Sequence, residues 1–232
     1  MKKVVVLTGA GMSADSGLKT FRDSNGLWEG HDLTEVATPE GWRENPEKVL
    51  KFYNARREQA HKAKPNKGHK ALARLEEKFD VTIITQNVDS LHERAGSSDV
   101  LHLHGELSKV RSAKDSSLIY DIGGDSIEMG DTADDGAQLR PHVVWFGEMV
   151  PNMDKAAQIV PTADILIVIG TSLVVYPAAG LTDYARSDIP KFIIDPNKPD
   201  LYDDTGWNHL QERAAVGTPK LVDRLMEKQY SE

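Results

Sequence analysis

The chain has 232 residues, a formal net charge of −8 at pH 7 and no cysteine. Without cysteine there is no disulfide, no thiolate metal ligand and no cysteine nucleophile, and the acidic balance argues against direct nucleic-acid binding, which needs a basic face. No apolar run approaches the roughly 18 residues of a membrane span, and the N-terminus turns into glycines before a signal-peptide core could form, so we expect a cytoplasmic protein with no membrane partner.

The pattern of elements predicts an α/β fold. Five short aliphatic runs are typical of buried parallel strands: 4–7, 81–85, 100–104, 165–169 and 192–194, with a weaker sixth at 142–146. Helical patterns lie between them at 46–60, with Asn45 as N-cap, and at 70–79, 177–186 and 218–228, with Thr218-Pro219 as the start of the last. Strands that alternate with helices predict a doubly wound, Rossmann-like parallel sheet.

Two stretches interrupt this alternation. Residues 29–78 carry two helical segments where a single crossover would need only one, and residues 108–140 are polar and rich in Asp, Ser and Gly. We therefore expect 1–232 to be a single domain. Its large lobe would comprise about 1–28, 79–107 and 141–232, and the two inserts would form a smaller lobe.

A glycine-rich turn follows the first predicted strand. Gly9, Gly11 and Ala14 form a Gly-x-Gly-x-x-Ala pattern, in which the first glycine allows a tight turn, the second lets a pyrophosphate approach the backbone and the alanine permits close helix packing. The acid usually found about 20 residues further on is missing, because Glu35 lies in a loop-like stretch. The pattern indicates a modified dinucleotide site, with a ligand-free strand–turn–helix connection as the alternative.

Polar groups also follow two other predicted strands. Gln86, Asn87 and Asp89 come after 81–85, and Gly170-Thr171-Ser172 comes after 165–169. Ligands of open α/β sheets bind at this carboxyl edge, although Asp89 could instead cap a helix. Three strand ends with such groups favour one shared site.

The sequence "DVLHLHGEL" places His102 and His104 two residues apart. A metal pair would need further ligands, and the remaining histidines show no ligand spacing. His104, at a strand end beside the other polar groups, is predicted to be a general base, and His102 a packing or supporting residue. Tyr53 and Arg56 share a helix face and suit a carboxylate, although a surface pair is the plainer interpretation.

Taken together, these segments resemble the signature motifs of the sirtuins, NAD-dependent protein deacylases, over nearly the whole chain. The resemblance lies in "GAGMSADSGLKTFR", "TQNVD", "HLHGEL", "VVWFGE" and "GTS". "FYNARR" further resembles the branch that prefers succinyl and malonyl groups. The resemblance implies a small lobe made of a helical module and a remnant of the family's zinc module.

The resemblance also implies roles for individual residues. His104 would be the catalytic base, with Asn87 and Asp89 lining the nicotinamide pocket and ordering a water. NAD would contact Gly9, Ala10, Gly11, Ser13, Asp15, Phe21, Arg22, Trp28, Gln86, Asn87, Val88, Asp89, Gly170, Thr171, Ser172, Asp195 and Ala214. The acyl-lysine substrate would contact Tyr53, Arg56, Val144, Phe146 and Gly147.

In the implied chemistry NAD is a consumed co-substrate. The acyl-lysine carbonyl oxygen attacks the nicotinamide ribose carbon and expels nicotinamide. His104 then deprotonates a ribose hydroxyl that attacks the imidate carbon, and water completes transfer to give free lysine and O-acyl-ADP-ribose. The partners would be acyl-lysine peptides or proteins, and we expect a monomer.

The sequence departs from the family pattern in its smaller lobe. The family usually carries four zinc-binding cysteines in the region that matches 108–140, and this chain has none. We therefore predict no structural zinc and an insert held by its own packing through Leu118, Ile119, Tyr120 and Ile122. Asp195 stands where the family often has asparagine. Alternatives to a desuccinylase are a plain deacetylase, an NAD-dependent ADP-ribosyltransferase and a non-catalytic NAD sensor.

Overall fold

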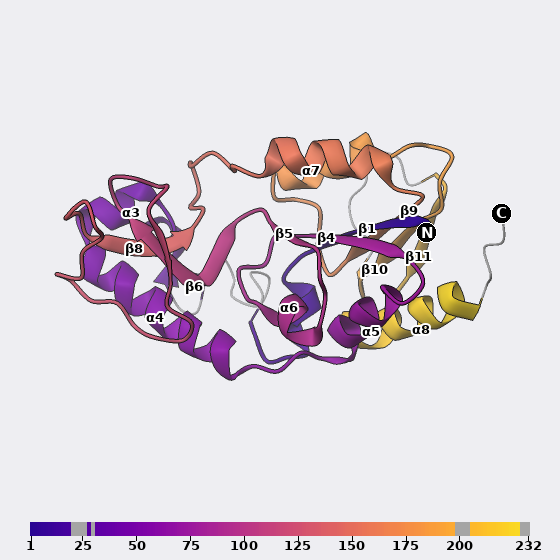
Figure 1. The fold of residues 1–232 in the computed structure, drawn as a ribbon, viewed down its shortest axis with the longest axis horizontal. Helices are drawn as coiled ribbons and strands as arrows, with labels where there is room; N and C mark the ends of the chain where they lie inside the picture. The colour runs from indigo at the N-terminus through magenta and orange to yellow at the C-terminus, as the bar shows by residue number, and fades with distance from the viewer. Residues whose placement is uncertain (20–26, 29–30, 198–204, 228–232) are drawn as a thin grey trace.

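The computed structural model describes residues 1–19, 27–28, 31–197 and 205–227. Figure 1 shows two lobes side by side, a large one that contains the N-terminus and a smaller one around α4 and β8. The predicted site residues Phe21 and Arg22 lie outside the described residues, as does the side chain of Trp28. Among the described residues, no helix combines the length and the apolar character needed to cross a bilayer.

A six-stranded sheet forms the centre of the large lobe, and every neighbouring pair in it is parallel. Its order is β11 (Trp207–Leu210), β10 (Lys191–Ile194), β9 (Ile165–Ile169), β1 (Lys3–Thr8), β4 (Asp80–Thr85) and β5 (Val100–His102). The chain runs outward from β1 through β4 to β5, then returns to the other side of β1 and runs outward again. This is the Rossmann order, with its switch point between β1 and β9, and the predicted doubly wound sheet is confirmed.

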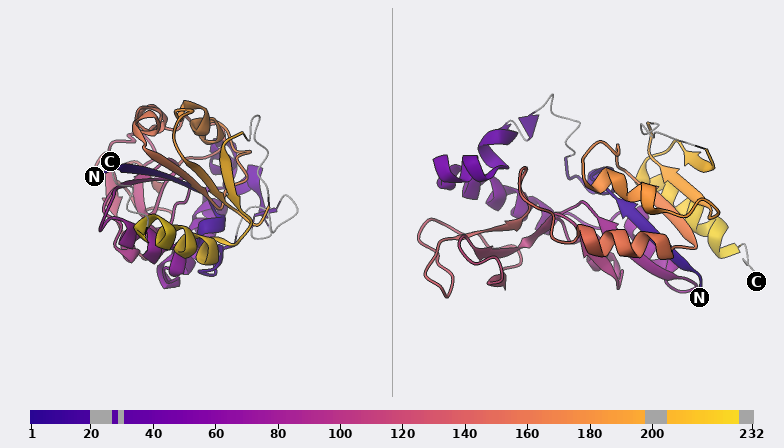
Figure 2. Two further views of the ribbon diagram at one scale, coloured as in Figure 1. Left: turned by 90° about the vertical axis from the view of Figure 1, so that its right-hand side faces the viewer. Right: turned by 90° about the horizontal axis from the view of Figure 1, so that it is seen from above.

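Both faces of this sheet are covered, which explains why its strands read as continuous aliphatic runs. Along β1, Val4 and Val6 pack toward α5 (Lys67–Leu75) and α8 (Ala214–Glu227). Val5 and Leu7 pack toward α7 (Met153–Ile159) and the 3-10 helices η2 (Val160–Thr162) and η3 (Ala178–Tyr184). Figures 1 and 2 show the resulting three layers. Helix α5 thus packs on the large sheet, although 29–78 was predicted to belong to the smaller lobe.

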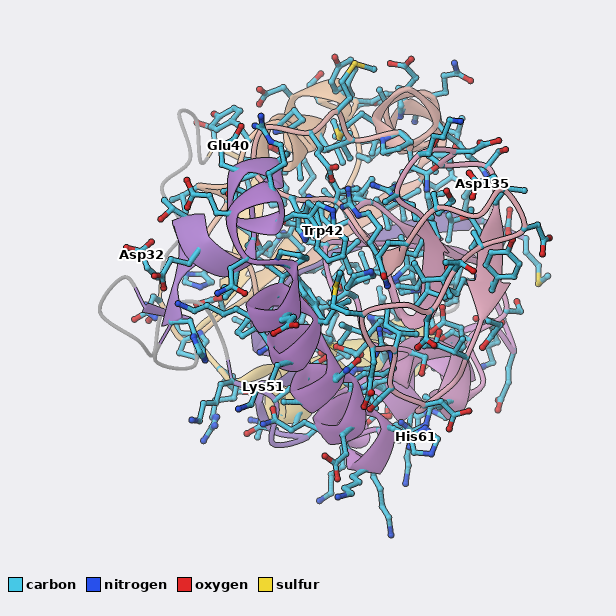
Figure 3. The ribbon with its side chains drawn as sticks, turned by 90° about the vertical axis from the view of Figure 1, so that its left-hand side faces the viewer. Asp32, Glu40, Trp42, Lys51, His61 and Asp135 are labelled. Atoms are coloured by element: carbon cyan, nitrogen blue, oxygen red, sulfur yellow. The ribbon has the colours of Figure 1, made fainter. Side chains whose placement is uncertain are left out.

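The smaller lobe combines helices with an antiparallel sheet. Its elements are β2 (Leu27–Trp28), β3 (His31–Asp32), α2 (Leu33–Val36), α3 (Pro39–Glu44), α4 (Pro46–Lys62), β6 (Gly105–Ser112), β7 (Ile119–Asp121) and β8 (Leu139–Val143), with sheet order β7-β6-β8. Helix α4 begins where predicted, and Asn45 caps it by accepting a hydrogen bond from the Lys48 backbone N–H at 3.0 Å. Figure 3 shows Trp42 pointing into the lobe and Asp32, Glu40 and Asp135 at its periphery.

Several predicted boundaries are wrong for identifiable reasons. The strand expected at 142–146 is β8, which begins before Pro141 and pairs at the edge of the small sheet, where a proline is tolerated. The strand expected at 100–104 ends at His102, three residues before Gly105, whose φ of +78° redirects the chain. Helix α8 starts at Ala214 and contains Pro219, because Ala214 packs in the same core under the sheet as Leu221, Val222 and Leu225. The 177–186 segment is a 3-10 helix.

Apolar packing holds the 108–140 insert in part as predicted. Tyr120 and Ile122 pack against a small buried cluster of Leu50, Val110 and Ile127. The prediction is wrong for Ile119, which is 43% exposed, because successive strand residues point to opposite faces.

A buried arginine on α4 ties the same insert down through polar contacts. The guanidinium of Arg57, 1% exposed, donates to Leu107 O at 2.6 Å, to Asn54 Oδ1 at 2.7 Å and to Asp125 O at 3.3 Å. Asn54 in turn donates to Ile127 O and accepts from its N–H. Burial lowers the pKa of Arg57 to about 10, so the side chain remains charged near neutral pH.

Gly105 occupies a position that only glycine fits. A Cβ there would lie 2.1 Å from His142 O on the paired strand β8. Gly105→Ala is expected to lower the free energy of unfolding by about 2–4 kcal/mol, because backbone strain and a steric clash act together. The change in the free energy of unfolding is measured by denaturant titration. The control is Gly130→Ala, where φ is +101° but nothing lies within 4 Å of the new Cβ, and about 1 kcal/mol is expected from strain alone. Equal losses in the two variants would contradict this.

Candidate active site

A cavity of about 880 Å³ lies at the carboxyl ends of β1, β4 and β9, next to the switch point of the sheet. These strand ends point toward the smaller lobe (Figure 1), which supplies the far wall from α4 and the segment after β8. The volume is in the range of cofactor-sized sites. The predicted residues that line it are Gly9, Ala10, Gly11, Ser13, Tyr53, Arg56, Gln86, Asn87, Val88, Asp89, His104, Val144, Phe146, Gly147, Gly170, Thr171, Ser172, Asp195 and Ala214.

Two glycine turns meet at the floor of this cavity. The backbone N–H of Gly9 donates to Ile169 O at 3.0 Å, and that of Gly11 donates to Gly170 O at 2.8 Å. A Cβ on Gly11 would lie 2.7 Å from Gly170 Cα, and one on Gly9 would lie 2.7 Å from Thr171 Cβ. The glycines are therefore needed for the contact between the two turns, a reason that the motif alone did not reveal. The helix that follows, α1 (Gly11–Ala14), is short as expected.

Asn87, Ser13 and Asp89 form a buried hydrogen-bonded set. Asn87 Nδ2 donates to Ser13 Oγ at 3.1 Å, and Ser13 Oγ donates to Asp89 Oδ2 at 2.9 Å. The other oxygen of Asp89 accepts from the Leu91 N–H at 3.1 Å, so the alternative reading of Asp89 as a local helix-start group also holds. Burial raises the pKa of the Asp89 carboxyl, against the lowering effect of these hydrogen bonds. The three side chains are held rigidly at the cavity wall.

The two predicted acids Asp15 and Asp195 differ in their position relative to the cavity. Asp15 is not among the cavity-lining residues, and its carboxylate pairs with Arg213 at 2.8 Å, which does line the cavity. Asp195 follows β10, is 3% exposed and lines the cavity. A carboxylate at a strand end is what Rossmann sites use for a ribose hydroxyl. Asp195 thus places a carboxylate at the cavity from a strand far along the chain, whereas Glu35 pairs with Lys48.

His104 lines the cavity with a defined tautomer. Its Nδ1 lies 3.0 Å from Gln86 O, and a carbonyl oxygen only accepts hydrogen bonds, so Nδ1 carries the hydrogen and Nε2 presents a lone pair. Burial lowers the pKa of His104, partly offset by the bond to Gln86. A neutral imidazole with an available lone pair can accept a proton near neutral pH.

His102 lies behind the site, and its predicted supporting role is confirmed by its contacts. Nδ1 lies 2.9 Å from Asn87 O and Nε2 lies 2.7 Å from Glu93 Oε1. Burial would lower the pKa of His102, but the hydrogen bond and charge of Glu93 raise it above the ordinary value. Both ring nitrogens face hydrogen-bond acceptors, which favours the protonated ring as a donor to Asn87 O and to Glu93.

At the other end of the cavity, Tyr53 and Arg56 line the wall from one face of α4. The Tyr53 hydroxyl accepts a hydrogen bond from Trp145 Nε1 at 3.1 Å, and burial raises the pKa of the phenol. Val144 N–H donates to His104 O at 2.9 Å, which ties the segment after β8 to the predicted base. Sequence reasoning missed Trp145 and its neighbours Arg140 and Glu148. "VVWFGE" contains two of them, but nothing in it signals their contacts.

A metal site finds no support in the described ranges. Within residues 1–19, 31–197 and 205–227, no group of three or more His, Cys, Asp or Glu side chains is placed to hold a metal ion. The chain also has no cysteine with which to build the thiolate site expected for the family.

The fold and the cavity at its switch point define an α/β protein of the Rossmann type with a dinucleotide-sized site. A family model described as "Sir2 family" matches residues 9–177. The chain belongs to the Sir2 family.

Curated relatives and solved structures agree. A Helicobacter pylori protein named NAD-dependent protein deacylase is 54% identical over 98% of this chain and 99% of its own length. A Bacteroides thetaiotaomicron protein of the same name is 51% identical over 97% and 99%. A Sir2 homologue solved as an NAD complex has a TM-score of 0.88 at 41% identity, over 97% of this chain and 90% of that one. Sir2Tm bound to a propionylated peptide has a TM-score of 0.77 at 30% identity, over 97% and 92%.

Proposed function

We propose that this chain is an NAD-dependent protein-lysine deacylase that releases nicotinamide and O-acyl-ADP-ribose and accepts acetyl and acidic acyl groups such as succinyl and malonyl. The observation that carries the proposal is that His104, the glycine turns and the Tyr53–Arg56 pair line one cavity. The name of the Helicobacter pylori relative and the NAD and propionyl-peptide complexes of the solved neighbours support it.

The residues present fit NAD. The two glycine turns line the cavity, and their close packing on each other keeps bulky side chains away from the place where a pyrophosphate would approach. Asp195 and Ala214 would receive the adenosine half, and Asn87 with Asp89 would face the nicotinamide. NAD supplies a ribose carbon that is activated by its nicotinamide leaving group.

His104 would act as the base in the transfer step. Its Nε2 lone pair would accept the proton of a ribose hydroxyl of bound NAD, which would make that oxygen a nucleophile toward the acyl carbon. The Gln86 carbonyl holds the Nδ1 hydrogen, so the ring cannot present the wrong tautomer. His102 keeps Asn87 and its neighbours in place from behind.

Tyr53 and Arg56 would bind the terminal carboxylate of an acidic acyl group. A phenol that burial keeps protonated is a hydrogen-bond donor, and a guanidinium supplies the opposite charge. The backbone of Val144 and Gly147 would bind the peptide as an added strand, a mode that recognises main chain more than sequence.

We also propose that the smaller lobe works without zinc, because the Arg57–Asn54 contacts and the apolar cluster around Val110 already hold the insert. The test uses purified protein, NAD and matched acetyl-lysine and succinyl-lysine peptides, with and without EDTA. Loss of acyl mass that requires NAD and ignores EDTA is expected. If neither peptide changes, the deacylase proposal fails. If EDTA abolishes turnover or lowers the unfolding temperature, the zinc-free proposal fails.

A further inference from the structure

Trp145 is held by four neighbouring residues at the end of the cavity that Tyr53 lines. Its indole N–H donates to the Tyr53 hydroxyl at 3.1 Å, and its backbone N–H donates to Glu148 Oε2 at 2.8 Å. The guanidinium carbon of Arg140 lies 3.3 Å from the centre of the indole ring. Trp42 packs nearby, with ring centres 5.7 Å apart. Trp145 is 2% exposed, so its ring has little freedom to turn.

Arg140 acts here through its shape. It is 7% exposed, and its two terminal nitrogens bind Glu148 at 2.7 and 3.2 Å while one also donates to Val143 O at 3.1 Å. Glu148 therefore neutralises the guanidinium charge locally, and the planar group remains as a flat support for the indole. Lysine could replace the charge of Arg140 but not this stacked plane.

The contact between Trp145 and Tyr53 determines what the phenol offers. A hydroxyl carries one hydrogen, and the Tyr53 oxygen already accepts the indole N–H. The phenolic hydrogen must then point away from Trp145, so the group acts as a donor in a fixed direction. A carboxylate needs such a donor, whereas an acetyl methyl group does not.

We infer that Arg140 is a positioning residue for acyl specificity: by stacking on Trp145 it fixes the Tyr53 hydroxyl as a donor to acyl groups that end in a carboxylate. This inference rests on the proposed deacylase function and deepens it. It assigns part of the preference for acidic acyl groups to a residue outside the Tyr53–Arg56 pair.

Arg111 provides a matched control. Both arginines lie on strands of the small sheet and pair with Glu148, Arg111 at 3.5 Å, but only Arg140 stacks on the indole. Arg140→Lys and Arg111→Lys both conserve charge. The measurement is kcat and KM for succinyl-lysine and acetyl-lysine peptides at saturating NAD, with unfolding temperatures recorded for both variants.

Arg140→Lys is expected to raise the KM for the succinyl peptide about tenfold relative to the acetyl peptide, the cost of misplacing one hydrogen bond to a charged group. Arg111→Lys is expected to leave this ratio within about twofold. Trp145→Phe keeps an aromatic ring and removes the N–H, so it is expected to shift the ratio in the same direction by about fivefold.

A double-mutant cycle with Tyr53→Phe separates positioning from general damage. Without the phenolic hydroxyl, Arg140→Lys is expected to cause no further shift in the succinyl-to-acetyl ratio. If the wild type is active and Arg140→Lys changes the KM values for both peptides equally, the inference fails and the deacylase proposal stands. The same conclusion follows if Arg140→Lys causes its full shift in the succinyl-to-acetyl ratio even in the Tyr53→Phe background. If the wild type shows no NAD-dependent turnover, both the inference and the deacylase proposal fail.

Discussion

His104→Ala is expected to reduce the rate of deacylation by about 10²–10⁴-fold, the usual contribution of a positioned general base. The ring is the cavity-lining group with a fixed Nδ1 hydrogen and a lone pair on Nε2. NAD affinity is expected to change little, since the glycine turns and Asp195 lie elsewhere in the cavity. Turnover is measured by nicotinamide release and NAD affinity by calorimetry. His61→Ala, an exposed histidine on α4 (Figure 3), is the control and is expected to behave as wild type.

The pH profile provides a second readout for His104. The base form is active, so kcat/KM falls as pH drops through the pKa of His104 in the free enzyme. Burial lowers that pKa, and the midpoint of the acid limb is therefore expected below the ordinary histidine value of 6.5. An acid limb above that value, or one that survives in His104→Ala, would remove His104 as the base.

Arg56→Met is expected to reduce kcat/KM for a succinyl-lysine peptide by about 30- to 100-fold, because a carboxylate entering the cavity loses its opposite charge. Deacetylation is expected to stay within about threefold, since an acetyl group has no charge to match. Steady-state kinetics on matched peptides measure both. Methionine keeps an unbranched apolar stem but removes the guanidinium, including the carbon that lies 5.8 Å from the centre of the Phe52 ring.

Lys51→Met is the matched control for Arg56→Met. Lys51 is a cation on the same helix, but it is exposed on the outer side of α4 (Figure 3). It is expected to leave both activities unchanged. Equal losses of desuccinylation and deacetylation in Arg56→Met would contradict a carboxylate-binding role for Arg56.

The large lobe was predictable because its strands are buried on both faces. The run at 4–7 has no polar residue, and in the structure it lies in the middle of a covered sheet. The start of α4 was equally predictable, since Asn45-Pro46 is a local signal that works in any surroundings.

The small sheet was not predictable from periodicity. Strands β6 and β7 are partly exposed and carry no regular alternation of apolar residues, so nothing in 105–121 resembles a buried strand. Their pairing is decided by long-range contacts, among them Arg57 on α4 with Leu107 O. The start of α8 depends in the same way on packing against the sheet, which overrode the local signal at Pro219.

The site residues likewise fall into those that the sequence could identify and those that depend on the fold. Gln86, Asn87, Asp89 and Thr171 were identifiable because they follow strands whose carboxyl ends must meet at one edge. The stack of Arg140 on Trp145 joins neighbouring residues through a fold-dependent geometry and then reaches Tyr53, 92 residues away. No spacing rule links such positions. Asp195 likewise became a candidate ribose partner on structural grounds only once β10 was placed beside β9.

The ratio of products is the most direct measurement of whether NAD cleavage is coupled to lysine deacylation in this cavity. A succinyl-lysine peptide is incubated with NAD and enzyme, and nicotinamide, free-lysine peptide and O-acyl-ADP-ribose are quantified together by mass spectrometry. Equal amounts of all three are expected throughout the time course. Nicotinamide released without deacylated peptide, or a gain of ADP-ribose mass on peptide or protein, would contradict deacylation and indicate ADP-ribosyl transfer.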